Sequence, residues 1–141
     1  MQLEVPVEIQ APPERVWEVL VDVESWPQWT ASMRKVERLD SGPFQVGSRA
    51  RIRQPRMPSV VWRVTAVEEG LSFVWEASRP GTKVVAGHVL RPTGAGRTLA
   101  TLTIDTSGFA ARLLAPLLDS TTRRYVEMEA EGLKRRAEST A

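Results

Sequence analysis

The sequence predicts an α+β fold in which a curved antiparallel sheet of about six or seven strands wraps around a long C-terminal helix. The chain opens with apolar and polar residues in alternation from Leu3 to Gln10, which is typical of a half-buried strand. Segments of strand length follow, and from about Phe109 to Glu138 both composition and spacing become helical. A length of 141 residues suffices for a real core without a second domain. We therefore expect a single domain over residues 1–141.

The first strand is expected to lead into two short helices. Pro6 indicates an edge strand, because proline cannot donate to the hydrogen-bond ladder of a central one. Pro12 and Pro13 suit the first turn of a helix, where a missing N–H costs nothing. The apolar face of that helix comprises Val16, Trp17, Val19, Leu20 and Val23.

Turn signals divide the middle of the chain into consecutive antiparallel hairpins. They occur at Ser41-Gly42-Pro43, Glu69-Gly70, Pro80-Gly81 and Gly94-Ala95-Gly96. The segments between them are rich in Val, Thr, Ile and Trp, as strands are. The expected strands span residues 33–39, 48–54, 59–67, 71–77, 83–91 and 97–105.

The last element is expected to press one stripe of side chains against the sheet. That stripe consists of Leu114, Leu118, Thr121, Tyr125, Met128 and Gly132. Pro116 removes one backbone donor, so a kink or a break is expected near the start of the helix.

Two motifs in the first thirty residues carry a family resemblance. Residues 11–17 read APPERVW directly after the first strand, and residues 26–29 read WPQW about ten residues later. Together they resemble the opening of the START-like (Bet v 1-like, SRPBCC) superfamily, in its polyketide cyclase/dehydrase-type branch. Residues 125–138 are similar to the closing helix of that family, so the resemblance spans essentially the whole chain. It implies a helix-grip fold and a cavity for a small apolar molecule, which it does not name.

Composition excludes several classes of function. Cysteine is absent, which rules out disulfides, thiolate catalysis and cysteine-based metal sites. A single histidine with scattered carboxylates forms no recognisable ligand set, so neither a metal nor a cofactor is expected. The acidic, alternating N-terminus is unlike a signal peptide, and no apolar run is long enough to span a bilayer. We expect a cytoplasmic protein without integral membrane association.

The net charge of +2 is unevenly distributed. No acidic residue occurs between Ser41 and Val67, and Arg49, Arg51 and Arg53 alternate along one face of a strand. We interpret them as a solvated outer face, since charge commonly protects strand edges. The alternative, an anion or nucleic-acid contact, lacks the interleaved aromatic residues of a stacking platform. Nucleic acid is therefore not an expected partner.

A ligand cavity is expected between the sheet and the terminal helix. The strand residues expected to face inward are Trp62, Val64 and Ala66, then Leu71, Phe73 and Trp75, then Ala86, His88 and Leu90, and finally Ala100, Leu102 and Ile104. The predicted ligand-binding residues are Trp26, Trp29, Ile52, Trp62, Val64, Phe73, Trp75, His88, Leu90, Leu102, Leu114, Leu118, Thr121 and Tyr125. The tryptophans and Phe73 are open to a second interpretation, as core filling. For Trp26 and Trp29 the alternatives are a lid and simple packing onto the sheet.

His88 is the one candidate for acid–base catalysis, because only histidine has an ordinary pKa near neutrality. No carboxylate is placed by the sequence to orient it, so a structural role is the preferred interpretation, and no catalytic residue is predicted. Tyr125 is expected to offer a ligand one hydrogen bond or to fill the core.

Three functions are consistent with the sequence. The preferred one is a carrier or sensor that binds a hydrophobic lipid, polyketide or isoprenoid-like molecule. The alternative is a polyketide cyclase/aromatase or dehydratase, which the resemblance associates with several polar groups in the cavity. Only His88, Thr121 and Tyr125 are expected there, and this shortage favours binding. The third is a protein-interaction module, although relatives of that kind carry a Trp-Trp pair where this chain has WPQW. A homodimer is left open.

Overall fold

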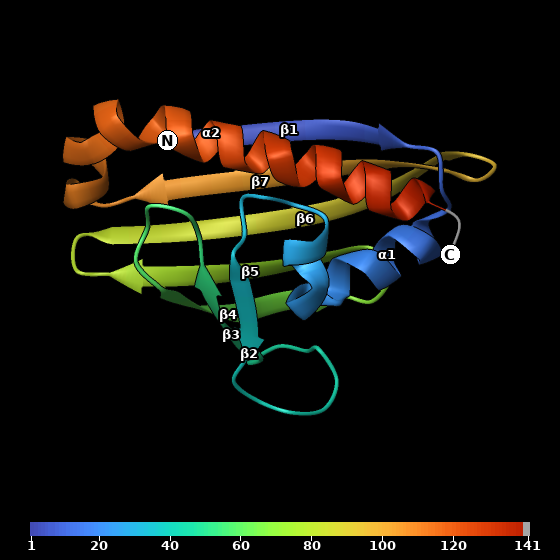
Figure 1. Cartoon of the computed structure of the whole chain (residues 1–141), viewed down its shortest axis with the longest axis horizontal. Helices are drawn as coiled ribbons and strands as arrows, with labels where there is room; N and C mark the ends of the chain where they lie inside the picture. The colour runs from blue at the N-terminus through green and yellow to red at the C-terminus, as the bar shows by residue number, and fades with distance from the viewer. Residues whose placement is uncertain (140–141) are drawn as a thin grey trace.

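Seven antiparallel strands form one sheet in the order β1-β7-β6-β5-β4-β3-β2. The structure is a computed structural model that describes residues 1–139; residues 140 and 141, which the single-domain prediction includes, lie outside the described residues. The elements are β1 (Gln2–Ile9), α1 (Pro13–Val21), the 3-10 helix η1 (Val23–Gln28), β2 (Lys35–Arg38), β3 (Arg49–Arg53), β4 (Val60–Glu68), β5 (Ser72–Arg79), β6 (Thr82–Gly94), β7 (Arg97–Ser107) and α2 (Phe109–Glu138) (Figure 1). The predicted helix-grip fold is confirmed.

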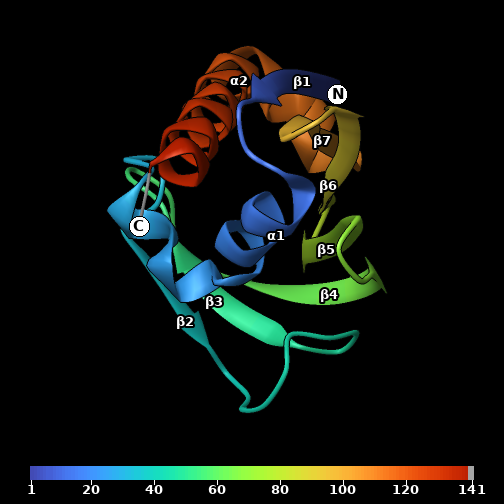
Figure 2. The ribbon, with the colours of Figure 1, turned by 90° about the vertical axis from the view of Figure 1, so that its right-hand side faces the viewer.

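The sheet curves around the helices, which lie on its concave side (Figure 2). Each strand from β2 to β7 pairs with the next in sequence, and β1 returns to pair with β7. β1 is therefore an edge strand, as Pro6 predicts, and Pro6 lies opposite Thr101. Arg49, Arg51 and Arg53 are exposed on β3, in agreement with a solvated outer face.

The helices that follow β1 lie over the concave face of the sheet. α1 buries its predicted apolar face, and the neighbouring η1 buries Val23 and Trp26. The indole Nε1 of Trp26 donates a hydrogen bond to the carbonyl oxygen of Leu20 at 3.0 Å, which satisfies the one polar atom of this buried ring.

Two residues predicted to face inward are instead exposed. The pairing of β4 with β5 shifts register between Val64 and Ala66, so that Ala66 is exposed and Val67 packs against the core. A bulge of this kind reverses the alternation of every residue beyond it. Leu71 precedes β5, where Gly70 turns the chain with φ of 80°, and it is 46% exposed.

Pro116 does not break α2, which is helical from Phe109 to Glu138. Figure 1 shows a change of direction near the start of the helix, consistent with the expected kink. The predicted stripe is only partly correct. Gly132 is its one buried residue, Thr121, Tyr125 and Met128 are half-buried, and Leu114 and Leu118 are exposed. The residues of α2 that are buried are Val126, Ala130, Gly132, Leu133 and Ala137.

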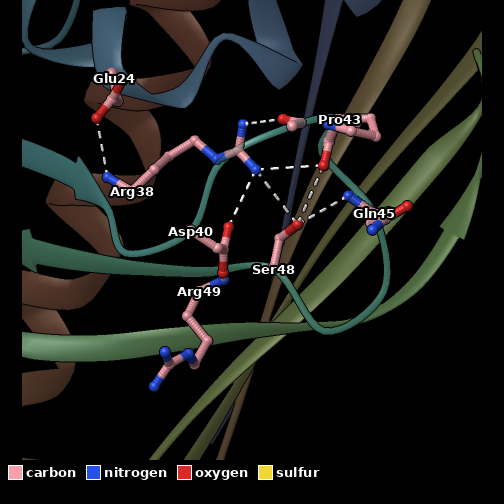
Figure 3. Close-up of polar contacts among 8 residues, drawn as sticks. Glu24, Arg38, Asp40, Pro43, Gln45, Ser48 and Arg49 are labelled. Carbon is pink, nitrogen blue, oxygen red and sulfur yellow. Dashed lines mark hydrogen bonds and ion pairs between the residues drawn. The ribbon is translucent and has the colours of Figure 1, made fainter.

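The loop between β2 and β3 is held by the side chain of Arg38 (Figure 3). Its guanidinium donates hydrogen bonds to the carbonyl oxygens of Gly42 and Pro43, at 2.8 and 3.3 Å, and contacts Asp40 at 3.1 Å. The same loop presents Phe44, whose ring packs edge-on against Phe73 with centroids 4.9 Å apart. Arg38 thus holds the loop that packs an aromatic ring against the core.

Candidate functional site

A cavity of about 320 Å³ lies between α2 and the concave face of the sheet. This volume is at the lower end of the range for small-molecule sites. Nine of the predicted ligand-binding residues line it, namely Trp26, Ile52, Trp62, Trp75, His88, Leu102, Leu114, Leu118 and Tyr125. They come from η1, five strands and α2, so the chain assembles the cavity from segments far apart in sequence.

The other five predicted residues do not line the cavity. Val64 and Leu90 are buried in the hydrophobic core. Phe73 is also buried, and its ring stacks on His88 with centroids 4.0 Å apart, which places it behind the imidazole. Trp29 is buried against α2 at Gly132. Thr121 does not line the cavity, whereas the next residue, Thr122, does. For Trp29 the packing interpretation therefore describes the structure better than a lid.

Three tryptophans form a continuous aromatic wall of the cavity. The ring centroid of Trp75 lies 5.4 Å from that of Trp26 and 5.8 Å from that of Trp62. The imidazole of His88 adjoins this wall, 5.7 Å from the ring of Trp26. Such a wall offers a large rigid surface to an apolar ring, at little cost in side-chain entropy.

His88 is 3% exposed, and its ring is held by the backbone of the neighbouring strand β5. Its Nδ1 lies 3.1 Å from the carbonyl oxygen of Phe73. Burial lowers the pKa of His88 to about 4, although the hydrogen bond to Phe73 acts in the opposite direction. The imidazole is therefore neutral at pH 7, with its proton on Nδ1, because a carbonyl oxygen can only accept.

Glu129 is a cavity residue that the sequence analysis missed. It lies on α2 and lines the cavity, and burial raises the pKa of its carboxyl to about 8. Within residues 1–139 the carboxyl has neither a hydrogen bond nor an ion pair. The spacing of Leu118, Thr122, Tyr125 and Glu129, at i, i+4, i+7 and i+11, is the signal that would have found it.

Polar groups also surround the mouth of the cavity. Arg56, in the loop between β3 and β4, and Arg79, at the end of β5, are exposed and line the opening, and Asp119 lines it from α2. The hydroxyl of Tyr125 donates a hydrogen bond to the carbonyl oxygen of Pro55 at 2.7 Å, which fastens the β3–β4 loop to α2.

The expected shortage of polar groups in the cavity is therefore wrong. Besides His88 and Tyr125, the lining includes Gln54, Arg56, Arg79, Thr82, Thr103, Thr106, Asp119, Thr122 and Glu129. Many of these residues lie outside the predicted stripe and the predicted inward faces, and their approach depends on how the sheet curves. The polar groups of the cavity therefore do not favour a carrier over an enzyme.

Within residues 1–139, no three His, Asp, Glu or Cys side chains lie close enough together to hold a metal ion. The helices described there include none with the length and apolar character needed to cross a bilayer.

Comparison with known proteins agrees with this architecture. Residues 1–138 match the family described as "Polyketide cyclase / dehydrase and lipid transport". No curated protein matches the sequence.

Several solved structures share the fold. One is the ZhuI aromatase/cyclase from Streptomyces sp. R1128, with a TM-score of 0.85 and 20% identity over 98% of this chain and 93% of that one. A norcoclaurine synthase mutant from Thalictrum flavum has a TM-score of 0.76 and 12% identity over 97% and 93% of the two chains. A START superfamily protein from Mycobacterium smegmatis has a TM-score of 0.74 and 17% identity over 96% and 97%. At these identities the likeness shows the fold alone.

Proposed function

Because the chain belongs to the family of polyketide cyclases, dehydrases and lipid-transport proteins, we propose that it binds a small, planar, hydrophobic molecule in the cavity under α2. The observation that carries this proposal is the wall of Trp26, Trp62 and Trp75 along an open cavity of about 320 Å³. A flat ring system laid against this wall would exchange water for aromatic surface.

The entrance to the cavity supports the same proposal. Leu114 and Leu118 of α2 line the opening and are partly exposed, so that an apolar ligand meets apolar side chains as it enters. Across the opening, the Tyr125 hydrogen bond holds the β3–β4 loop in place. One neutral hydrogen bond contributes about 1 kcal/mol, so the loop can open at a modest cost.

A second candidate function, cyclase or dehydratase activity, is favoured by Glu129 and His88. Both line the cavity, and their pKa values of about 8 and about 4 are displaced in opposite directions from 4.5 and 6.5. At pH 7 the carboxyl is a proton donor and the imidazole a proton acceptor, which is the pairing that acid–base chemistry on a carbonyl compound requires.

Binding is tested by calorimetric titration with planar polycyclic hydrocarbons and phenols. We expect saturable binding with a negative heat-capacity change, because apolar surface is buried. Trp62→Ala should weaken binding by about tenfold or more, since a wall residue is removed. Val61→Ala is the matched control, because Val61 is partly exposed at the adjacent position of the same strand and does not line the cavity. If no compound binds at its solubility limit, the proposal fails.

Catalysis is tested separately, by turnover of a bound poly-carbonyl substrate. An enzyme should lose about 10²-fold or more of its rate on Glu129→Gln or His88→Gln while it still binds the substrate. A binding protein that does not catalyse shows no turnover above the uncatalysed rate.

A further inference from the structure

We propose that the inner end of the cavity recognises a neutral planar ligand through one hydrogen-bond donor, the carboxylic acid of Glu129, and one acceptor, the Nε2 atom of His88. The ligand class is a ring system that bears both a carbonyl and a hydroxyl group. An acid anion of the same shape is discriminated against. This inference rests on the proposed function and names the class of molecule bound.

The acceptor follows from the hydrogen bond on the other side of the imidazole. Nδ1 lies 3.1 Å from the carbonyl oxygen of Phe73, which has no proton to give, so Nδ1 carries the ring proton. Nε2 of the neutral ring is then left with a free lone pair. Because His88 lines the cavity and no other hydrogen bond to its ring is present in residues 1–139, that lone pair is available to a ligand hydroxyl.

The donor follows from the surroundings of Glu129. The side chain is half-buried and lines the same cavity, without a partner in the described chain. An ionised carboxylate here would have no compensating contact with residues 1–139, and burial raises the pKa of this group to about 8. The group is therefore a neutral acid near pH 7, able to donate its proton to a carbonyl oxygen.

A chain of contacts links the donor to the acceptor. Glu129 lies about one turn before Gly132, which packs against Trp29. The ring of Trp29 lies 5.5 Å from that of Trp26, which in turn lies 5.7 Å from that of His88. The mouth residue Leu118 is eleven positions earlier on α2, or roughly 16 Å along the axis.

The other charged and titratable groups that line the cavity do not neutralise Glu129. Arg56 and Arg79, from the β3–β4 loop and β5, are exposed at the opening, and neither forms an ion pair with it. Asp119 lies ten residues earlier on α2, roughly 15 Å away along the axis. Tyr125 is one turn away but directs its hydroxyl proton at Pro55. His88 is neutral at every pH well above 4.

These groups determine which ligands fit. A carbonyl oxygen accepts from Glu129, a hydroxyl donates to His88, and the ring between them lies against the tryptophans. A carboxylate ligand would bring a charge to Glu129 and His88, neither of which is a cation, and it would lose its hydration there. Above pH 8 Glu129 itself ionises, so that it no longer donates to a carbonyl group.

The test compares probes that share the naphthalene ring, by equilibrium dialysis at pH 6.5 and pH 9.5. At pH 6.5 we expect 2-acetylnaphthalene to bind about tenfold more tightly than naphthalene, and 2-naphthoate more weakly than either. At pH 9.5 the advantage of 2-acetylnaphthalene should disappear. Glu129→Gln should keep the advantage at both pH values, because an amide donates without titrating. Glu131→Gln, at an exposed position of the same helix, should behave as the unmodified protein.

The acceptor is tested by a second matched pair at pH 6.5. We expect 2-naphthol, which has a hydroxyl proton, to bind about tenfold more tightly than 2-methoxynaphthalene. His88→Phe should abolish this difference while the preference for 2-acetylnaphthalene over naphthalene persists.

Two failures are distinguishable. If naphthalene binds but 2-acetylnaphthalene gains nothing at pH 6.5, or the gain is unchanged at pH 9.5, the inference is overturned while the proposed function stands. If no member of the series binds, the proposed function fails and the inference with it.

Discussion

Gly132 of α2 packs directly against the main chain of Trp29, with no space for a side chain between them. A Cβ atom at position 132 would collide with the carbonyl oxygen of Trp29 and lie 2.9 Å from its ring atom Cε3. This contact joins the segment after η1 to the C-terminal half of α2. The helix is thus held at the end of the cavity where Glu129 lies.

Gly132→Ala should destabilise the protein although alanine is the better helix former. Helix propensity favours alanine by about 1 kcal/mol, but overpacking against a fixed main chain costs about 1–3 kcal/mol. We expect a net loss in the free energy of unfolding by urea titration. Glu131→Ala, at the exposed neighbouring position, has only the propensity gain and should be neutral or slightly stabilising. A Gly132→Ala protein more stable than the original would contradict the contact.

The pH dependence of stability should reveal Glu129. Its pKa is about 8 when folded against 4.5 when unfolded, so the folded state holds an extra proton in that window and stability falls as pH rises. His88, with a pKa lowered from 6.5 to about 4, gives the opposite slope between those values. Glu138, whose pKa is lowered from 4.5, changes the stability of the protein only below about pH 4.5.

Of these three groups, Glu129 is the one that contributes between pH 6.5 and 8. The free energy of unfolding should fall by up to about 1.4 kcal/mol per pH unit across this window. Urea titrations at closely spaced pH values measure the slope, and Glu129→Gln should remove it. An equal slope in that variant would show that another group is responsible.

The two ends of α2 should respond differently to a charge. Leu118, at the mouth, is 43% exposed, so Leu118→Asp should cost about 1 kcal/mol or less. Leu133 is fully buried, and Leu133→Asp should cost about 4 kcal/mol or more, because an ionised group would be stranded in the core. Thermal unfolding compares the two. Equal losses would mean that Leu118 is buried.

Arg38 should not be replaceable by lysine. Its guanidinium reaches Gly42, Asp40 and Pro43 together, which a single ammonium group cannot do. Arg38→Lys should therefore lower the free energy of unfolding, measured by urea titration, by about 1–2 kcal/mol. Arg49→Lys is the control, because only the backbone N–H of Arg49 is bonded to Asp40. A loss of similar size in both variants would indicate a general effect of charge in this loop.

Most of the fold was predictable because its signals are local. Alternation, turn residues and helical spacing placed the strands and helices within a few residues of their observed bounds. The errors occur where pairing between strands intervenes: the bulge after Val64 exposes Ala66 and turns Val67 inward, and nothing in the local pattern marks it.

The sequence by itself determined the order of elements, the family motifs and an aromatic, apolar cavity wall, since these depend on residue type and spacing. Only the tertiary structure decided which polar groups other than His88 and Tyr125 reach the cavity. In the sequence Glu129 is one acid among several on a charged helix, and its pKa is raised because other elements of the fold partly bury it. His88 likewise becomes a neutral acceptor through its hydrogen bond to Phe73, which is fifteen residues away in sequence but lies opposite His88 on the adjacent strand. Protonation depends on surroundings, and only folding brings those surroundings together.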